Sequence, residues 1–272
     1  MKAAITISLV EQARGGPFVF WDNLANGCEQ AAALGFDAVE IFAPSAEAID
    51  RKALHEMLAR HKLKVAAMGS GAGWLIHKWH LCHAVAGVRQ QAREFIGKIV
   101  ELAGEFGAPA IIGSMQGRVE GAVSRQQALE WLREALNDLG EQAARHQQTL
   151  LFEPLNRYET NVLNRLGDTA AFLETLKIKN VKILADLFHM NIEETSIAGA
   201  LRATANHLGH VHFADSNRRA IDLGHTEMKP VMEALRETGY AGYLSAEVLP
   251  LPDSEAAAKQ TIKAYRECCA IN

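Results

Sequence analysis

The chain has few of the features that would place it in a membrane or on nucleic acid. No apolar run approaches the roughly 20 residues that a membrane span needs, and residues 1–8 lack the apolar core and cleavage site of a signal peptide. Lysine and arginine are scattered without a basic run, and the formal net charge is −4. We therefore expect a cytoplasmic protein that binds neither membrane nor nucleic acid.

Cysteine is also scarce, and its positions form no motif. Cys28, Cys82, Cys268 and Cys269 show no CxxC spacing, and the adjacent pair cannot easily form a disulfide with each other. None lies in a motif that would activate its thiol for catalysis. We interpret all four as reduced thiols.

Long linkers, low-complexity segments and charge runs are missing, so nothing marks a domain boundary. Hydrophobic residues make up 49% of the chain and charged residues 22%, as in ordinary globular proteins. A length of 272 residues is near the usual size of an α/β barrel. We expect one domain that covers residues 1–272.

What the sequence does contain is a series of short apolar, β-branched stretches. Their hydrophobicity is nearly continuous, without polar alternation, which is typical of parallel strands that are covered on both faces. Eight stretches are candidate strands: residues 4–9, 38–42, 65–69, 110–113, 150–153, 181–186, 210–214 and 243–247.

Segments with helical periodicity lie between these stretches, and good examples are residues 45–61, 87–106, 124–146, 168–176 and 228–238. Candidate N-caps are Ser45, Ser124 and Asp168, and candidate C-terminal stops are Gly35, Gly107 and Gly239. Strand and helix alternate eight times, which favours a closed (β/α)8 TIM barrel, an α/β fold, over an open sheet. The longest irregular stretches, 70–86 and 215–227, follow strands, where loops build the active face of such barrels.

Four residues of the metal-ligand type end four consecutive predicted strands: Glu153, Asp186, His212 and Glu247. Neighbouring strand ends meet at one mouth of a barrel, so these side chains can surround one ion. Any one of them could instead cap the following helix, but apolar strands rarely carry four ionisable groups unless these are paired or metal-bound. Three carboxylates and one imidazole suit Mn²⁺ best in our interpretation, with Mg²⁺ or Co²⁺ as alternatives.

Longer motifs surround these four positions: EPLNRYET at 153–160, ADLFHMNIEE at 185–194, HFADSNR at 212–218 and AEVLP at 246–250. They resemble the D-tagatose 3-epimerase group, which belongs to the xylose-isomerase-like sugar phosphate isomerase/epimerase barrels. The resemblance is close in the second half of the chain and loose in the first.

The resemblance implies that Glu153, Asp186, His212 and Glu247 hold the metal ion. It also implies that Glu159, His189 and Arg218 contact a small-molecule sugar substrate near its reacting carbons, and that the protein is a homodimer or homotetramer. We therefore expect a metal-dependent epimerase of a small ketose or keto-sugar acid, acting beside the ketone at C3.

Such a reaction needs a stabilised enediolate and one acid/base group on each face of it. Glu153 and Glu247 end strands that are not neighbours in the barrel, so their carboxylates can flank a substrate. We assign both of them as catalytic proton carriers.

Three other functions stay open. An aldose–ketose isomerase working between C1 and C2 could use the same ion and the same two glutamates. An abasic-site endonuclease on this barrel would need three metals and basic loops, for which the sequence shows no sign. A non-catalytic sugar-binding protein would be expected to have lost a proton-transfer glutamate, and both are present.

Two loops bear on the substrate. Trp74 or Trp79 could stack on the apolar face of a sugar, and plain packing inside the protein is the alternative for both. Arg118, in the segment Gly113–Arg118, could bind a carboxylate or phosphate, so the charge of the substrate stays open.

Overall fold

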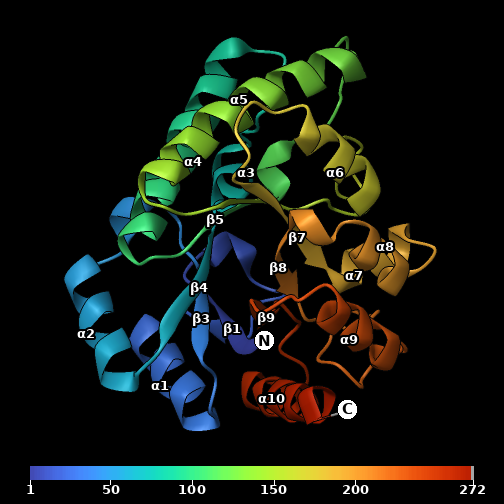
Figure 1. The fold of residues 1–272 in the computed structure, drawn as a ribbon. Coiled ribbons are helices and arrows are strands. Elements are labelled where there is room, and N and C mark those ends of the chain that lie inside the picture. Colours follow the sequence, from blue (N-terminus) through green and yellow to red (C-terminus); the bar gives the residue numbers. More distant parts are fainter. Residues whose placement is uncertain (271–272) are drawn as a thin grey trace.

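The computed structural model describes residues 1–270, and its centre is a ring of eight parallel strands (Figure 1). The ring consists of β1 (Lys2–Ser8), β3 (Ala38–Phe42), β4 (Lys64–Gly69), β5 (Ala110–Ile112), β6 (Leu150–Phe152), β7 (Val181–Asp186), β8 (Leu208–His212) and β9 (Tyr243–Ala246). Because β1 pairs with β3 on one side and with β9 on the other, the sheet closes on itself. This confirms the predicted (β/α)8 TIM barrel, and the strand positions agree with the predicted stretches to within two residues.

A further strand, β2 (Phe20–Trp21), lies beside the ring and was not predicted from the sequence. It pairs with Ile7 and Ser8 of β1, just beyond the point where the pairing of β1 with β9 ends at Ile5. A two-residue strand is too short to show periodicity in the sequence. Its position is set by pairing with Ile7 and Ser8, which β9 leaves unpaired.

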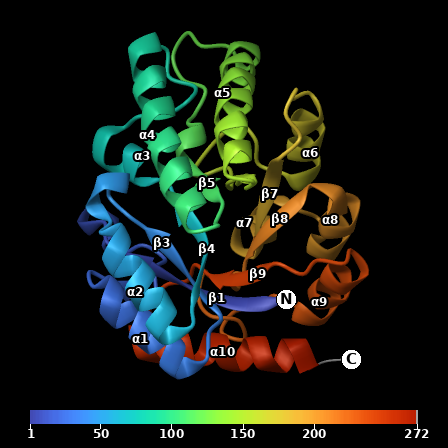
Figure 2. The same cartoon turned by 60° about the vertical axis from the view of Figure 1, so that its left-hand side comes forward.

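Helices surround the ring and cover its outer face (Figures 1 and 2). The longer ones are α1 (Leu24–Leu34), α2 (Arg51–His61), α4 (Ala86–Glu105), α5 (Arg125–Arg145), α6 (Leu166–Glu174), α9 (Met228–Glu237) and α10 (Ser254–Ala270), and the shorter ones are α3 (Ala72–His77), α7 (Leu187–Glu193) and α8 (Ile197–Ala203). Helix α10 packs on α1 and β1, so the last described helix lies beside the first strand. Within residues 1–270, no helix has the length and apolarity needed to cross a membrane.

The helix ends agree in part with the predicted signals. Ser124 caps α5 and accepts a hydrogen bond from the N–H of Gln127 at 3.1 Å. The three predicted stops adopt positive φ angles of 89°, 64° and 71° at Gly35, Gly107 and Gly239, which is the left-handed conformation that favours glycine after a helix.

Two predicted caps and one predicted loop are wrong. Ser45 precedes a short 3₁₀ turn, and α2 begins only after Asp50, whose Oδ1 accepts from the N–H of Ala53 at 3.0 Å. Asp168 lies within the first turn of α6 and does not cap it. The stretch 70–86, expected to be irregular, contains α3.

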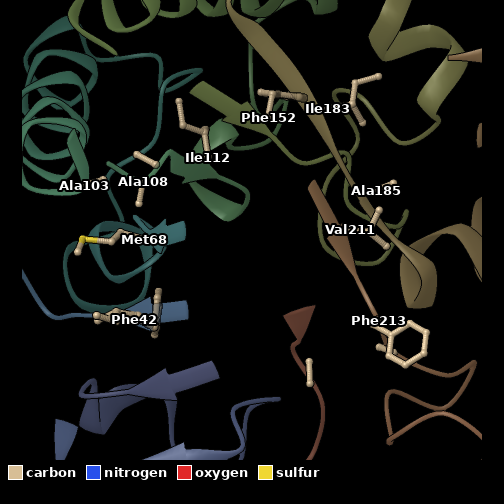
Figure 3. Close-up of a cluster of buried hydrophobic side chains, with 14 of the residues drawn as sticks. Phe42, Met68, Ala103, Ala108, Ile112, Phe152, Ile183, Ala185, Val211 and Phe213 are labelled. Atoms are coloured by element: carbon tan, nitrogen blue, oxygen red, sulfur yellow. The ribbon is translucent and has the colours of Figure 1, made fainter. Parts of the chain in front are cut away.

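Side chains in the strands alternate between two apolar layers. In β6, Leu150 and Phe152 belong to the large outer cluster that packs against helices, whereas Leu151 joins a small inner cluster with Ala67, Ile111 and Leu184. Figure 3 shows part of the outer layer, with Phe152, Ile183, Ala185 and Val211 among its members. Because strand side chains repeat every two residues, the positions two after Leu151 and Leu184, which are Glu153 and Asp186, also face the barrel interior.

Candidate metal centre and active site

Four side chains from four adjacent strands meet at the carboxyl end of the barrel. Glu153 follows β6, Asp186 and His212 are the last residues of β7 and β8, and Glu247 follows β9. One ligand atom of each lies within 4.8 Å of the other three. His212 Nδ1 lies 3.4 Å from Glu153 Oε1, 3.5 Å from Asp186 Oδ2 and 3.6 Å from Glu247 Oε2. The structure thus brings together all four residues singled out in the sequence.

The facing atoms of this cluster are buried and lack hydrogen-bond partners. These atoms are Glu153 Oε1, Asp186 Oδ2 and His212 Nδ1. Buried polar atoms are normally paired, and converging carboxylates repel one another, so the arrangement is costly without a counter-charge. A divalent cation would satisfy all of them at once, and an oxygen-rich donor set with one imidazole suits such an ion. The residues present therefore fit a divalent metal.

Glu40 was not singled out in the sequence, yet it orients His212. It lies within β3, is buried, and places Oε1 3.1 Å from His212 Nε2 and Oε2 2.9 Å from His210 Nε2. Because an ionised carboxylate only accepts hydrogen bonds, Nε2 of His212 carries the proton and Nδ1 turns its lone pair towards the cluster. The available signal was a glutamate inside the apolar stretch 38–42, where a charge normally needs a partner.

Burial and crowding shift the pKa values of the cluster. Burial raises the pKa of Glu153 to about 7, with Glu247 and Asp186 adding to the shift and His212 opposing it. Burial alone would lower the pKa of His212, but the carboxylates of Glu40 and Glu247 raise it well above its usual value. The upward shift of the His212 pKa, against the effect of burial, reflects the negative charge of the carboxylates around its ring.

Arg218 spans the carboxylates at the mouth of the barrel. Its Nη2 donates to Glu247 Oε2 and lies 3.6 Å from Asp186 Oδ2, while its Nη1 lies 3.4 Å from Glu159 Oε1. Its Cζ stands 4.8 Å from the ring centroid of Phe188. Arg218 and Glu159, two of the three predicted substrate contacts, both line the cavity above the cluster.

His189, the third predicted contact, lies behind the cluster and is not among the residues that line the cavity. Its Nδ1 accepts from the main-chain N–H of Asn156 at 3.3 Å, so the proton of the neutral ring is on Nε2. That Nε2 is buried without a partner, 3.6 Å from Asp186 Oδ2 and 3.9 Å from Glu153 Oε1. Burial lowers the pKa of His189 to about 3.

A cavity of about 230 Å³ opens above the cluster. Glu153, His212, Arg218 and Glu247 line its polar end. The opposite wall is largely apolar and comes from the first half of the chain: Pro17, Phe18, Ile41, Phe42, Trp74 and Leu75. Phe18 stacks on Phe42 with ring centroids 4.6 Å apart and an interplanar angle of 8°, so these two rings support each other in the wall.

Arg118 lies outside this cavity. Its Nη1 donates to the main-chain oxygen of Tyr158 at 3.1 Å, and its Nε lies 3.9 Å from Glu120. The same loop contributes Gly113 and Ser114 to the lining instead. The structure therefore gives Arg118 no contact with a molecule in the cavity.

Fold and site together define a (β/α)8 barrel with a candidate metal centre at the carboxyl ends of its strands. Residues 28–268 match the family described as xylose isomerase-like TIM barrel, and the chain belongs to that family.

Similar proteins are named epimerases, which are isomerases. A D-psicose 3-epimerase of Agrobacterium fabrum is 28% identical over 98% of this chain and 91% of its own length. A 3-dehydro-D-guloside 4-epimerase of Escherichia coli is 35% identical over half of each chain. The structure of a 3-keto-D-glucoside 4-epimerase from E. coli, 24% identical, matches 99% of this chain and 100% of its own with a TM-score of 0.82. The resemblance seen in the motifs is confirmed.

Proposed function

We propose that this protein is a metal-dependent epimerase of a small ketose, which inverts the carbon beside the ketone. The observation that carries the proposal is the meeting of Glu153, Asp186, His212 and Glu247, with unpaired buried atoms, at the base of a cavity. The names of the relatives support it, because a 3-epimerase of a 2-ketose and a 4-epimerase of a 3-keto sugar both invert a carbon next to a carbonyl.

In this proposal Glu153, Asp186, His212 and Glu247 hold one divalent ion, with Mn²⁺ the first choice and Mg²⁺ or Co²⁺ the alternatives. When bound, the ion supplies positive charge that stabilises the oxygen of the ketone as the neighbouring C–H bond breaks.

Glu153 and Glu247 are the two proton carriers. They follow β6 and β9, which are separated by β7 and β8, so their carboxylates approach a substrate from different sides. One takes the proton from the carbon beside the ketone, and the other returns a proton on the opposite face. Arg218 orients Glu247 through its hydrogen bond to Oε2.

His189 and Glu159 complete the proposed contacts. The unpaired Nε2–H of His189 faces the carboxylates of Asp186 and Glu153 and not the cavity, so in this proposal it reaches only a substrate oxygen that lies directly against the cluster. Glu159 holds Arg218 in place and, being at the rim of the cavity, can accept a hydrogen bond from a sugar hydroxyl.

The lining of the cavity favours a neutral ketose over a keto-sugar acid or a phosphorylated sugar. Within the described residues, Arg218 is the only arginine or lysine in the lining, and it already faces three carboxylates. The far end offers apolar rings and the hydroxyl groups of Ser70 and Ser114. An anionic group there would be desolvated without a counter-charge.

We also propose that the protein works in the cytoplasm and forms a homodimer or homotetramer, as the resemblance implies. Size-exclusion chromatography with light scattering measures the oligomeric state directly.

The function is tested by turnover in deuterated water. The purified protein is stripped of metal with a chelator, reloaded with Mn²⁺, and incubated with D-psicose, D-tagatose, L-ribulose and a 3-keto-D-glucoside, and NMR locates the incorporated deuterium. Label at C3 of a 2-ketose is the expected result. Label at C1 only would identify an aldose–ketose isomerase, and the absence of turnover with every sugar would contradict the proposal.

The role of Glu247 is tested by substitution. Glu247→Gln should abolish turnover while the variant still binds the ketose, because the amide cannot carry the proton. Glu227→Gln, which alters an exposed glutamate before α9, serves as the matched control and should keep full activity. An active Glu247→Gln enzyme would refute this assignment.

A further inference from the structure

Asp215 is buried, with 1% of its surface exposed, in the loop that follows β8 and carries Arg218. Its carboxylate accepts four hydrogen bonds, all from main-chain N–H groups of the same loop. Oδ1 accepts from Ser216 at 2.7 Å and Thr226 at 2.9 Å, and Oδ2 accepts from Asp222 and Gly224 at 3.0 Å each. One side chain therefore gathers the two ends of the loop 215–226.

The main chain of Asp215 closes a tight turn around Arg218. Its N–H donates to the carbonyl oxygen of Arg219 at 2.9 Å, and its carbonyl oxygen accepts from the N–H of Arg218 at 2.8 Å. Arg218 has a φ of 59°, a left-handed conformation that a residue with a side chain adopts only when its surroundings impose it. The direction of the Arg218 side chain thus depends on this turn.

The other end of the turn is tied to the segment that carries Glu247. The carbonyl oxygen of Arg218 accepts from the N–H of Leu249 at 2.8 Å, and the Arg218 guanidinium donates to Glu247 Oε2. Main chain and side chain of Arg218 are therefore both anchored next to the proposed proton carrier. A shift of the turn would move the guanidinium relative to Glu247.

Gly224 provides an independent sign that the loop is built around the carboxylate. A Cβ atom placed on Gly224 would overlap Asp215 Oδ1 and crowd Ser216 Oγ. Only glycine lets the main chain come close enough for its N–H to reach Asp215. Burial would raise the pKa of Asp215, but the N–H groups of Thr226, Ser216 and Gly224 lower it, so the carboxylate is held ionised.

We propose that Asp215 is a positioning residue, whose carboxylate fixes the loop 215–226 so that Arg218 stays against Glu247 and Glu159 during turnover. Asp215 is not among the residues that line the cavity or form the metal cluster, so it acts through Arg218. The inference rests on the proposed function, in which Arg218 lies beside the reacting carbons.

The test is a double-mutant cycle. Asp215→Asn keeps the shape and one acceptor oxygen but replaces the other acceptor with a donor that opposes the loop N–H groups. We expect kcat to fall by about 10-fold to 100-fold, since displacing a group by about 1 Å has effects of that size, with a smaller change in KM and an unchanged affinity for Mn²⁺ by calorimetry. In an Arg218→Ala background the same substitution should change kcat by less than about threefold.

Asp222→Asn is the matched control, because its side chain is exposed and only its N–H contacts Asp215. It should leave kcat unchanged. The proposal would be overturned if Asp215→Asn lowered kcat equally in the unaltered protein and in the Arg218→Ala variant. It would also be overturned if Asp215→Asn did not lower kcat in the unaltered protein.

A crystal structure of Asp215→Asn gives a readout that does not depend on turnover. We expect the Arg218 guanidinium to leave Glu247, and an unmoved guanidinium would refute the positioning role whatever the activity. If the unaltered protein with Mn²⁺ converts no ketose, the proposed function fails, and the structure of the variant still decides the role of Asp215.

Discussion

Glu40 determines which nitrogen of His212 faces the candidate metal centre. Its two oxygens accept from His212 and His210, so both rings are held with a proton on Nε2. A glutamine could accept at one oxygen only and would present N–H donors at the other position. One histidine would then have to turn or change its tautomer, which weakens the ligand.

We therefore expect Glu40→Gln to weaken Mn²⁺ binding by about 10-fold to 100-fold, the usual effect of losing such a supporting carboxylate. Isothermal titration calorimetry on the chelator-treated protein measures the affinity. Glu29→Gln, at an exposed position in α1, is the control and should bind Mn²⁺ as the unaltered protein does. An unchanged affinity in Glu40→Gln would show that His212 keeps its orientation without Glu40.

His80 should make stability depend on pH. Burial, together with the neighbouring His83, lowers the pKa of His80 to about 4, below the value of about 6.5 for an unfolded chain. The folded state then resists protonation of His80 more than the unfolded state does. The contribution of neutral His80 to the free energy of unfolding is therefore complete above about pH 6.5 and is lost as the pH falls towards 4. His80→Gln should therefore lose less stability than the unaltered protein between pH 7.5 and 5.

Urea unfolding at the two pH values measures this difference. His61→Gln, at a partly exposed histidine that ends α2, is the control. If His80→Gln shows the same pH dependence as the unaltered protein, His80 does not become charged in this range on unfolding.

The residues that sequence patterns could reveal were those at strand ends. Glu153, Asp186, His212 and Glu247 each interrupt an apolar stretch, and the barrel geometry then predicts that they converge. Glu40 could not be assigned a role in this way, because its partner His210 lies 170 residues further along the chain. Asp215 lies in one of the sequence motifs, but its carboxylate accepts only from main-chain N–H groups, which every residue except proline has. No pattern of side chains could therefore predict these contacts.

At the scale of elements, the two serines predicted as helix caps differ in the structure, and their effects on stability can be compared by substitution. Ser124 accepts a hydrogen bond from the N–H of Gln127, so Ser124→Ala should lower the free energy of unfolding by about 1 kcal/mol. Ser45 makes no capping hydrogen bond, so Ser45→Ala should cost much less. Urea unfolding of both variants gives the comparison, and similar losses would mean that capping does not separate the two serines.

The strands were more predictable than the short elements around them. A strand that is buried on both faces has to be apolar, which leaves a clear signal in the sequence. Helix α3, by contrast, has only six residues, with Gly71 directly before it and Gly73 within it, which is too short a segment for helical periodicity to show. Short helices are stabilised by tertiary packing, and Gly73 of α3 sits where a Cβ would meet the side chain of Met115.

At the scale of the whole molecule, the two halves of the barrel have different tasks. Strands β6 to β9 supply all four residues of the candidate metal centre, whereas the first half supplies Glu40 and the apolar wall with Phe18, Phe42 and Trp74. Changes in the wall can therefore alter which sugar fits without altering the cluster. Because the four candidate ligands end four neighbouring strands, a bound ion would connect these strand ends to one another.

Binding of an ion to these four residues should stabilise the folded state. Mn²⁺ at about 100 times its Kd contributes about 2.7 kcal/mol if it binds only the folded state, which for a domain of this size raises Tm by about 5 to 10 °C. Asp186→Asn removes one ligand charge but keeps Oδ1, which accepts from the N–H of Phe188 at 2.7 Å, so the variant should fold and lose most of the shift. Differential scanning calorimetry with and without Mn²⁺ measures both proteins. Equal shifts in the two would place the bound ion away from Asp186, since an ion that does not touch this carboxylate would stabilise both alike.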